Sequence, residues 1–202
     1  SLLERSLTIR EEVYGPDHPD LTVTVNNLAL VLHDLGQLDD AEALYRRALA
    51  TKAEVFGVRS PPYLATLNNL ADLHFQRGDL PAARQEWQQV VDTCEVELGA
   101  GNRRTLSTRV QLSRVDAASG RLAAAEAEIA AAVQLLTETL GDAHPEVAMV
   151  RSRQAALLLE MGRPQEAEPL VRQALEIMTD SPGEEHPRYR ELLMVAAGVD
   201  AA

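Results

Sequence analysis

Residues 24–57 read TVNNLALVLHDLGQLDDAEALYRRALATKAEVFG, and this stretch decides the fold because its landmarks return 42 residues later. The glycine that closes it recurs at that interval, at Gly15, Gly57, Gly99, Gly141 and Gly183. A second glycine keeps the same interval, at Gly36, Gly78, Gly120 and Gly162. One such unit is too small to bury its own apolar face, so neighbouring units must stack to form a continuous core. The period therefore predicts a stacked array, which favours an extended binding surface over a catalytic pocket.

Each repeat contains two helical patterns, one on either side of the second glycine. In the first repeat the apolar positions with helical spacing are Leu21, Val25, Leu28, Leu32 and Leu35, then Leu38, Ala41, Leu44, Ala48 and Val55. Gly36 suits the left-handed cap that ends a helix. We expect a helix over about 1–14, helix pairs over about 19–56, 61–98, 103–140 and 145–180, and a last helix over about 187–198. The predicted fold class is all-α, a solenoid of antiparallel helix pairs.

The linkers between repeats carry histidines that could suggest a metal site or a proton relay. They read GPDHP at 15–19, GDAHP at 141–145 and GEEHP at 183–187. Proline stands where the next helix begins and a backbone amide would lack a partner anyway. The 42-residue spacing puts His18, His144 and His186 on separate repeats. We therefore expect these histidines to start helices, and we expect no metal ligands among them.

Composition excludes several classes of function. The net charge of −12 disfavours nonspecific binding to nucleic acid or anionic lipid. No apolar run approaches the roughly 20 residues that a membrane-spanning helix needs, and no signal peptide is visible. The one cysteine, Cys94, cannot form an internal disulfide, which favours a reduced, cytoplasmic setting. Basic residues are almost all arginine, with Lys52 the only lysine, a bias typical of GC-rich bacteria.

The pattern resembles tetratricopeptide repeats (TPR), specifically the 42-residue subtype of kinesin light chains and many bacterial signalling proteins. The matching residues are 24–29, Gly36, 41–42, 44–49 and Gly57, with a second copy of the asparagine signature at 67–71. The resemblance covers essentially all 202 residues. It implies a right-handed superhelix, in a single array over 1–202. Full units would cover about 15–56, 57–98, 99–140 and 141–182, with half units at 1–14 and 183–202, as in a segment of a longer array.

The resemblance also implies that the first helix of each pair lines the concave wall, where a ligand would bind. The family's groove positions fall on Val23, Asn27, Leu30, Asp34, Ala65, Asn69, Asp72, Gln76, Ser107, Gln111, Arg114, Ala118, Met149, Arg153, Ala156 and Glu160. Steps of four, three and four keep each set on one helical face, which supports the assignment independently. The partner-binding candidates are Asn27, Asn69, Asp72, Gln111, Arg114 and Arg153, with Asn26, Asn68, Leu30 and Gln76 as further possibilities.

Two interpretations of the asparagines remain open. Asn27, Asn69, Gln111 and Arg153 would form a polar ladder, and side-chain amides can bracket the backbone of an extended peptide because they both donate and accept. Alternatively, the asparagines hydrogen-bond neighbouring helices and hold the pitch of the array. In the third and fourth repeats the Asn pair becomes 110–111 and 152–153, a departure from the family pattern for contacts with a peptide backbone.

Charge is distributed unevenly between the two helix types. Segment 103–114 holds four arginines and no acid, and Arg151 and Arg153 follow one repeat later, whereas the second helices are acidic. A basic inner wall on an acidic protein favours an acidic peptide segment or a terminal carboxylate as ligand. The alternative is that these arginines form surface ion pairs with Asp116, Glu146 or Glu160.

The leading function is a protein-interaction module that binds a peptide or partner domain and has no chemistry or cofactor of its own. The alternative is a regulatory or sensor segment of a larger signalling protein, such as a nucleotide-switch ATPase or a protease. An enzyme has little support, because no phosphate-binding loop, nucleophile motif or metal cluster is visible. Weak self-association through the array ends is also expected, from apolar residues at Leu2, Leu3, Leu7, Leu192, Leu193 and Val195.

Overall fold

The computed structural model describes residues 2–16, 18–180 and 187–200, and within them it contains helices and no strand. The helices are α1 (Leu2–Tyr14), the 3-10 turn η1 (Pro19–Leu21), α2 (Thr22–Asp34), α3 (Leu38–Phe56), α4 (Pro61–Arg77), α5 (Leu80–Leu98), α6 (Arg103–Ala118), α7 (Leu122–Leu140), α8 (Pro145–Glu160), α9 (Pro164–Asp180) and α10 (Pro187–Asp200). The all-α prediction is confirmed, and every predicted helix pair is present with ends within a few residues.

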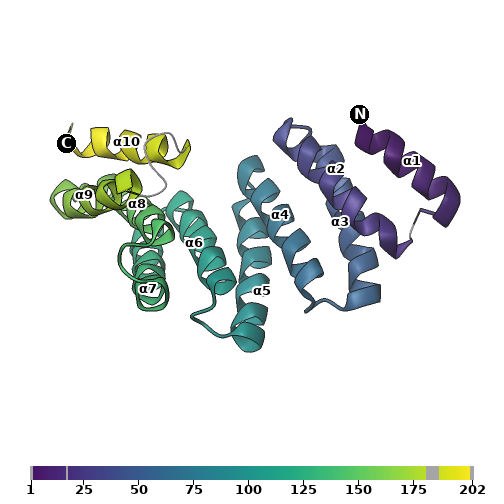
Figure 1. Ribbon diagram of the computed structural model, residues 1–202, viewed down its shortest axis with the longest axis horizontal. Helices are drawn as coiled ribbons and strands as arrows, with labels where there is room; N and C mark the ends of the chain where they lie inside the picture. The colour runs from purple at the N-terminus through teal and green to yellow at the C-terminus, as the bar shows by residue number, and fades with distance from the viewer. Residues whose placement is uncertain (1, 17, 181–186, 201–202) are drawn as a thin grey trace. The chain divides into compact units, whose positions relative to one another are not determined.

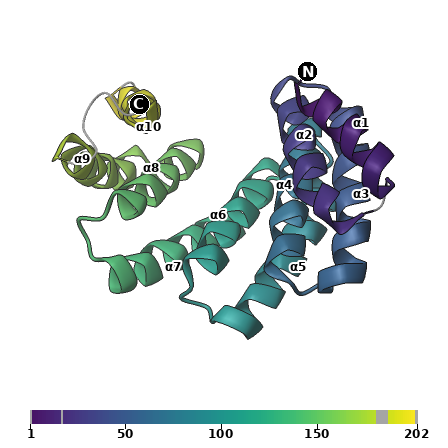
Figure 2. The ribbon, with the colours of Figure 1, turned by 45° about the vertical axis from the view of Figure 1, so that its right-hand side comes forward.

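Within each of the two compact units given below, consecutive helices pack against one another, as antiparallel pairs require (Figure 1): α1 on α2, α2 on α3 and α3 on α4 in the first, and α6 on α7, α7 on α8, α8 on α9 and α9 on α10 in the second. We call α2, α4, α6, α8 and α10 the first helices, and α1, α3, α5, α7 and α9 the second helices. Within the first unit α2 also touches α4, and within the second α10 packs on both α8 and α9 (Figure 2). The chain divides into two compact units, unit 1 at residues 1–93 and unit 2 at residues 94–202, with the boundary inside α5.

Linker residues cap the helical elements that follow them: His18 caps η1, whereas Asn102 and His144 cap α6 and α8. His18 Nδ1 accepts from the Asp20 amide at 3.2 Å, and His144 Nδ1 accepts from the Glu146 amide at 3.1 Å. Asn102 Oδ1 accepts from the Arg104 amide at 2.9 Å. Different residue types therefore accept from backbone amides of the first helical turn, which have no partner within the helix. The predicted helix-entry role is confirmed for both histidines, whereas His186 lies outside the described residues.

The two glycine series adopt different backbone conformations. Gly78 ends α4 in the left-handed helical region, with φ 84° and ψ 6°. Gly57 ends α3 with φ 84° and ψ 155°, a region that is essentially restricted to glycine. A Cβ built at either position meets nothing within 4 Å, so backbone conformation and not space demands glycine.

This difference predicts unequal responses to the same substitution. Gly78→Asn is expected to cost well under about 1 kcal/mol, because asparagine tolerates the left-handed helical region. Gly57→Asn is expected to cost about 1–3 kcal/mol, because it places a side chain in a glycine-only region. Urea denaturation of the two variants beside the wild type measures the difference, and equal costs would contradict the conformational argument.

The core repeats in step with the sequence. His33 on α2 meets Tyr45 on α3 edge-on, with ring centroids 6.2 Å apart. One repeat later, Phe75 and Trp87 occupy the same two positions, with centroids 5.8 Å apart. Small residues at Ala41, Ala83, Ala125 and Ala167 are all fully buried, which lets the paired helices approach closely. Not every apolar position in the pattern is buried, since Leu35 is 69% exposed and Val55 is 45% exposed.

The array ends are partly covered. Leu7 is 6% exposed and joins the core of α2 and α3, and Leu192 is 2% exposed within the core of α8 and α9. The expectation that these two side chains lose cover at the array ends is therefore wrong, while Leu193 is exposed and Val195 is half-buried. The side chains of Leu2 and Leu3 lie outside the described residues. Self-association through the ends remains a prediction.

The only lysine of the chain is buried inside unit 1. Lys52 on α3 is 6% exposed, and its Nζ donates to Thr66 Oγ1 at 2.6 Å. Among the described residues it has no carboxylate partner, and burial lowers the pKa of its ammonium group. The equivalent positions in the later repeats are Cys94, Leu136 and Met178, all buried. A charge therefore stands where the other repeats place an uncharged core side chain.

Replacing this lysine is expected to stabilise the protein. Because the folded pKa lies below the unfolded one, the unfolded chain binds more protons, so wild-type stability is penalised at neutral pH and recovers as pH rises through the folded pKa. Lys52→Met is expected to raise the free energy of unfolding at pH 7 by about 1 kcal/mol. The gain should shrink toward pH 10. Urea denaturation at several pH values measures this, with Leu136→Lys, the reverse change in unit 2, expected to destabilise. A less stable Lys52→Met variant would contradict the argument.

Candidate functional site

In unit 1 the candidate residues lie on the solvent-exposed side of the first helices. Asn27 and Leu30 on α2 are exposed, Asn69 and Asp72 on α4 are half-buried, and Gln76 is exposed. This face also carries apolar surface, since Leu30 is 41% exposed and Val23 is 64% exposed. The face is therefore amphipathic and reachable from solvent.

The two neighbouring asparagines are held by other helices. Asn26 Oδ1 accepts from Thr66 Oγ1 on α4 at 2.9 Å. Asn68 Oδ1 accepts from Trp87 Nε1 on α5 at 3.0 Å. For these two residues the geometry matches the structural interpretation, in which asparagine side chains tie neighbouring helices together. The exposed Asn27 makes no such bond among the described residues.

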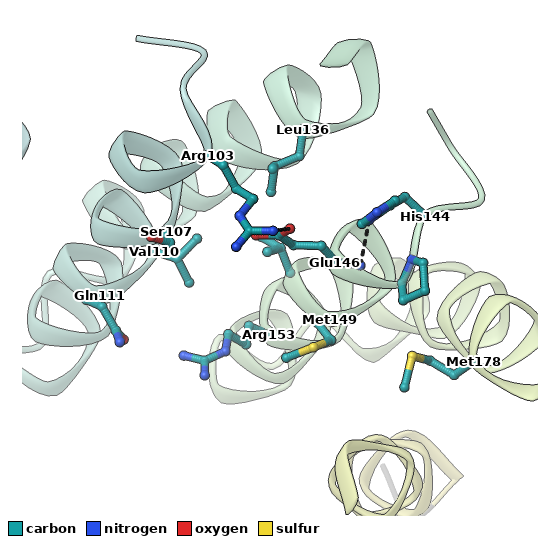
Figure 3. A pocket seen from close by; sticks show the side chains of 12 residues that line it. Arg103, Ser107, Val110, Gln111, Leu136, His144, Glu146, Met149, Arg153 and Met178 are labelled. Atoms are coloured by element: carbon teal, nitrogen blue, oxygen red, sulfur yellow. Dashed lines mark hydrogen bonds and ion pairs between the residues drawn. The ribbon is translucent and has the colours of Figure 1, made fainter. Parts of the chain in front are cut away.

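Unit 2 contains a cavity of about 460 Å³ between α6 and α8 (Figure 3). Four of the sixteen positions assigned to the groove from the sequence line it, namely Ser107 and Gln111 on α6 and Met149 and Arg153 on α8. Its remaining walls are mainly apolar side chains, from Val110, Leu136, Pro145, Val150 and Met178. The cavity therefore joins apolar walls to polar groups on the face of the first helices.

The charged groups of the cavity come from both first helices. Arg103, at the start of α6, approaches Glu146, at the start of α8, with Nη1 3.8 Å from Oε2. Arg153 lies two turns further along α8 and is half-buried (Figure 3). Beside the cavity, Arg114 Nη1 donates to Gln111 Oε1 at 2.7 Å. The partner-binding residues predicted from the sequence include neither Arg103 nor Glu146, because only folding brings the starts of these two helices together. Glu146 appears there only as a possible ion-pair partner.

Two arginines assigned to the basic wall face elsewhere. Arg109 lies between two second helices and donates to Glu95 on α5 and to Glu128 on α7, at 3.0 and 2.9 Å. Burial alone would lower the pKa of Arg109, but the two carboxylates outweigh it and raise the pKa. Arg151 pairs with Asp142 in the linker before α8. The expectation that these two arginines form part of the inner wall is wrong, because both occupy the buried side of their helices.

The ion-pair alternative holds in part. Arg103 does pair with Glu146, as that interpretation proposed, while Asp116 pairs with Arg121 across the turn that follows α6. Both contacts lie within unit 2.

Among the described residues there is no cluster of side chains that could hold a metal ion. The described helices also include none with the length and apolar character needed to cross a membrane.

Comparison with known proteins identifies the repeats. A family model described as the MalT-like TPR region matches residues 11–198, and a tetratricopeptide repeat model matches residues 1–20. The chain belongs to the MalT-like TPR region family. The resemblance to tetratricopeptide repeats is thereby confirmed. No curated protein matches this MalT-like TPR region.

Solved structures similar in fold to this MalT-like TPR region include kinesin-light-chain-like repeat proteins. Two crystal structures of a putative kinesin light chain from Podosopora anserina, with nearly identical TPR-like repeats, give TM-scores of 0.71 and 0.70 at 23% identity. Each alignment covers 91% of this chain and 95% of the other. BtubC (BKLC) from P. vanneervenii gives a TM-score of 0.72 at 24% identity, over 84% of this chain and 68% of that one. These likenesses show the fold, an array of TPR helix pairs, and TPR arrays generally mediate protein–protein interaction.

Proposed function

We propose that this MalT-like TPR region binds a partner protein, or an extended peptide segment of one, on the faces of its first helices and has no chemistry of its own. The observation that carries the proposal is the cavity in unit 2. Four side chains assigned to the binding face from spacing and family resemblance, Ser107, Gln111, Met149 and Arg153, line one cavity with an apolar interior. A concave site with apolar walls and a few polar groups is the usual form of a binding site.

The chemistry of the cavity favours an acidic segment with an apolar side chain. Val110, Leu136 and Val150 offer apolar surface for a buried side chain. Arg103 and Arg153 place two guanidinium groups on the lining, against one carboxylate from Glu146. Guanidinium groups bind carboxylates through paired hydrogen bonds, so the excess of positive charge on the lining favours an acidic ligand.

A pull-down with the whole chain, followed by peptide mapping and calorimetric titration of the mapped segment, tests the proposal. We expect a segment that contains an acidic residue close to an apolar one. Affinity is expected to fall as salt rises, because the charged groups are partly solvent-exposed. A mapped segment without acidic residues, or an affinity that does not respond to salt, would overturn the preference for acidic ligands.

A further inference from the structure

Three polar side chains, one from each of three helices, form a hydrogen-bonded chain inside unit 1. Lys52 Nζ on α3 lies 2.6 Å from Thr66 Oγ1 on α4, and Thr66 Oγ1 lies 2.9 Å from Asn26 Oδ1 on α2. Lys52 and Thr66 are buried, with 6% and 0% of their surface exposed, whereas Asn26 is half-buried. The chain therefore runs from a buried ammonium group to a side chain that solvent can reach.

The direction of the protons along this chain is fixed by chemistry. An ammonium group only donates, so Thr66 Oγ1 accepts from Lys52 and gives its single proton onward. Asn26 Oδ1 is the nearer acceptor at 2.9 Å, against 3.3 Å for the Pro62 carbonyl oxygen. The amide oxygen of Asn26 is thus used, and its Nδ2 keeps two donors that bond to none of the described residues. The ammonium group behind it polarises the chain and strengthens these donors.

The repeat register shows that this polar chain replaces an apolar contact. The residues two 42-residue periods later are Val110 for Asn26, Leu136 for Lys52 and Val150 for Thr66. All three later residues line the cavity in unit 2. The same place in the repeat therefore has an apolar form in unit 2 and a cationic form in unit 1. Since a buried ammonium group without a carboxylate costs stability, its presence is better explained by binding than by packing.

The surroundings of Asn26 suit a ligand. Val23 and Leu30 lie three residues before and four residues after Asn26, so the three share one side of α2. Both apolar side chains are exposed, at 64% and 41%. None of the groove positions assigned to α2 and α4 is basic, so Lys52 supplies positive charge from below the surface. A carboxylate bound here would accept from an N–H of Asn26 Nδ2, an amide that the ammonium group behind it polarises.

We propose that the Asn26 amide, oriented by Lys52 through Thr66, binds a carboxylate group of the partner protein. This second site rests on the proposed function, because it places the partner on the first helices of unit 1 as well. The carboxylate is either a side chain of aspartate or glutamate or the terminal carboxylate of the chain. Its recognition needs neither the cavity nor the arginines of unit 2.

The single lysine makes this proposal directly measurable. Lysine labelled with carbon-13 at Cε gives one side-chain signal, from Lys52. Three probes are titrated against the whole chain: N-acetyl-aspartic acid amide, with a side-chain carboxylate; N-acetyl-alanine, with a terminal one; and neutral N-acetyl-asparagine amide. We expect a saturable shift with at least one carboxylate probe and none with the neutral probe. The stronger carboxylate probe identifies the source of the group.

Two variants separate binding from folding. Thr66→Val keeps the shape and the ammonium group but breaks the chain, and it is expected to weaken probe binding about fivefold or more, as for loss of a charge-assisted bond. Thr108→Val removes the equivalent hydroxyl one repeat later, which among the described residues bonds to the Arg104 carbonyl oxygen alone, and should leave binding unchanged. Lys52→Met should weaken partner binding although the protein becomes more stable, an outcome that a purely structural lysine would not give.

The outcomes also distinguish this inference from the proposed function. No shift with either carboxylate probe, or equal affinity in wild type and Thr66→Val, overturns the inference. If the partner still binds and Arg153→Ala still weakens it, the proposed function stands without the second site. If the probes bind as expected but partner affinity responds to neither Arg153→Ala nor Lys52→Met, the proposed function is the part that fails.

Discussion

Replacing Trp87 by alanine is expected to lower the free energy of unfolding of unit 1 by about 3–5 kcal/mol. The side chain has no exposed surface, and it is among the largest fully buried side chains. Its ring packs on Phe75, and its Nε1 is the donor that satisfies Asn68 Oδ1. The substitution therefore opens a cavity and leaves a half-buried amide oxygen without its partner. Since domains are typically stable by about 5–15 kcal/mol, unit 1 should come close to unfolding.

Urea denaturation followed by far-ultraviolet circular dichroism measures this effect without relying on the tryptophan itself. Trp87→Phe keeps a ring and loses the donor, so we expect it to cost about 1–2 kcal/mol. Val96→Ala, on the same helix at a site that is 74% exposed, is expected to change stability by less than about 0.5 kcal/mol. A cost for Trp87→Ala as small as that of Val96→Ala would contradict the assigned core of unit 1.

The second large effect concerns binding. Arg153→Ala is expected to weaken an acidic partner by about tenfold or more, because a charge-assisted hydrogen bond contributes about 1.5–3 kcal/mol and each 1.4 kcal/mol is one decade. Arg153→Lys keeps the charge but loses the planar fork, so only part of the affinity should return. The melting temperature is expected to change little, because Arg153 lies on the cavity lining and outside the apolar core of unit 2.

The matched control is Arg172 on α9, an exposed arginine paired with Glu168. Arg172→Ala should leave both affinity and melting temperature unchanged. Calorimetric titration gives the affinities, and thermal denaturation gives the melting temperatures. Unchanged affinity together with a large drop in melting temperature for Arg153→Ala would make this arginine structural, and the cavity would then lose its assigned ligand.

The sequence predicts the helix boundaries well because local chemistry determines them. The turn after α4 has a positive φ at position 78, which glycine adopts without strain, and Asn102 or His144 caps the helix that follows it. Helical spacing is less reliable near helix ends. Leu35 and Val55 continue the apolar pattern, yet both are exposed, and each stands at or next to the end of its helix.

Buried polar groups were not predictable, because spacing alone does not show which side of a helix a charged residue occupies. In the third and fourth repeats, Arg109 and Arg151 occupy the core position that Val25 and Leu67 fill in the first and second repeats, where both are buried. They reach carboxylates that only the folded chain brings near. Lys52 stands out in the sequence as the single lysine, but its buried partner, Thr66, comes from the next helix pair.

The candidate site could be predicted in part from the sequence. Steps of four residues select Gln111 from Ser107, and Arg153 from Met149, and all four line the cavity. The contact of Arg103 with Glu146 depends on how α6 and α8 pack, which no single helix pattern contains. Residue type and helical face were therefore available from the sequence, whereas the cavity itself was not.

The central claim, that a partner binds on the first helices, is tested most directly by site-specific photocrosslinking. A photoreactive amino acid is placed at Ser107, exposed on the cavity lining of α6, and separately at Gln134, exposed on the second helix α7. Both proteins are irradiated in the presence of the partner found by pull-down. We predict a crosslinked product from position 107 and none from position 134. Crosslinking from position 134 alone would contradict the account and would place the partner on the second helices.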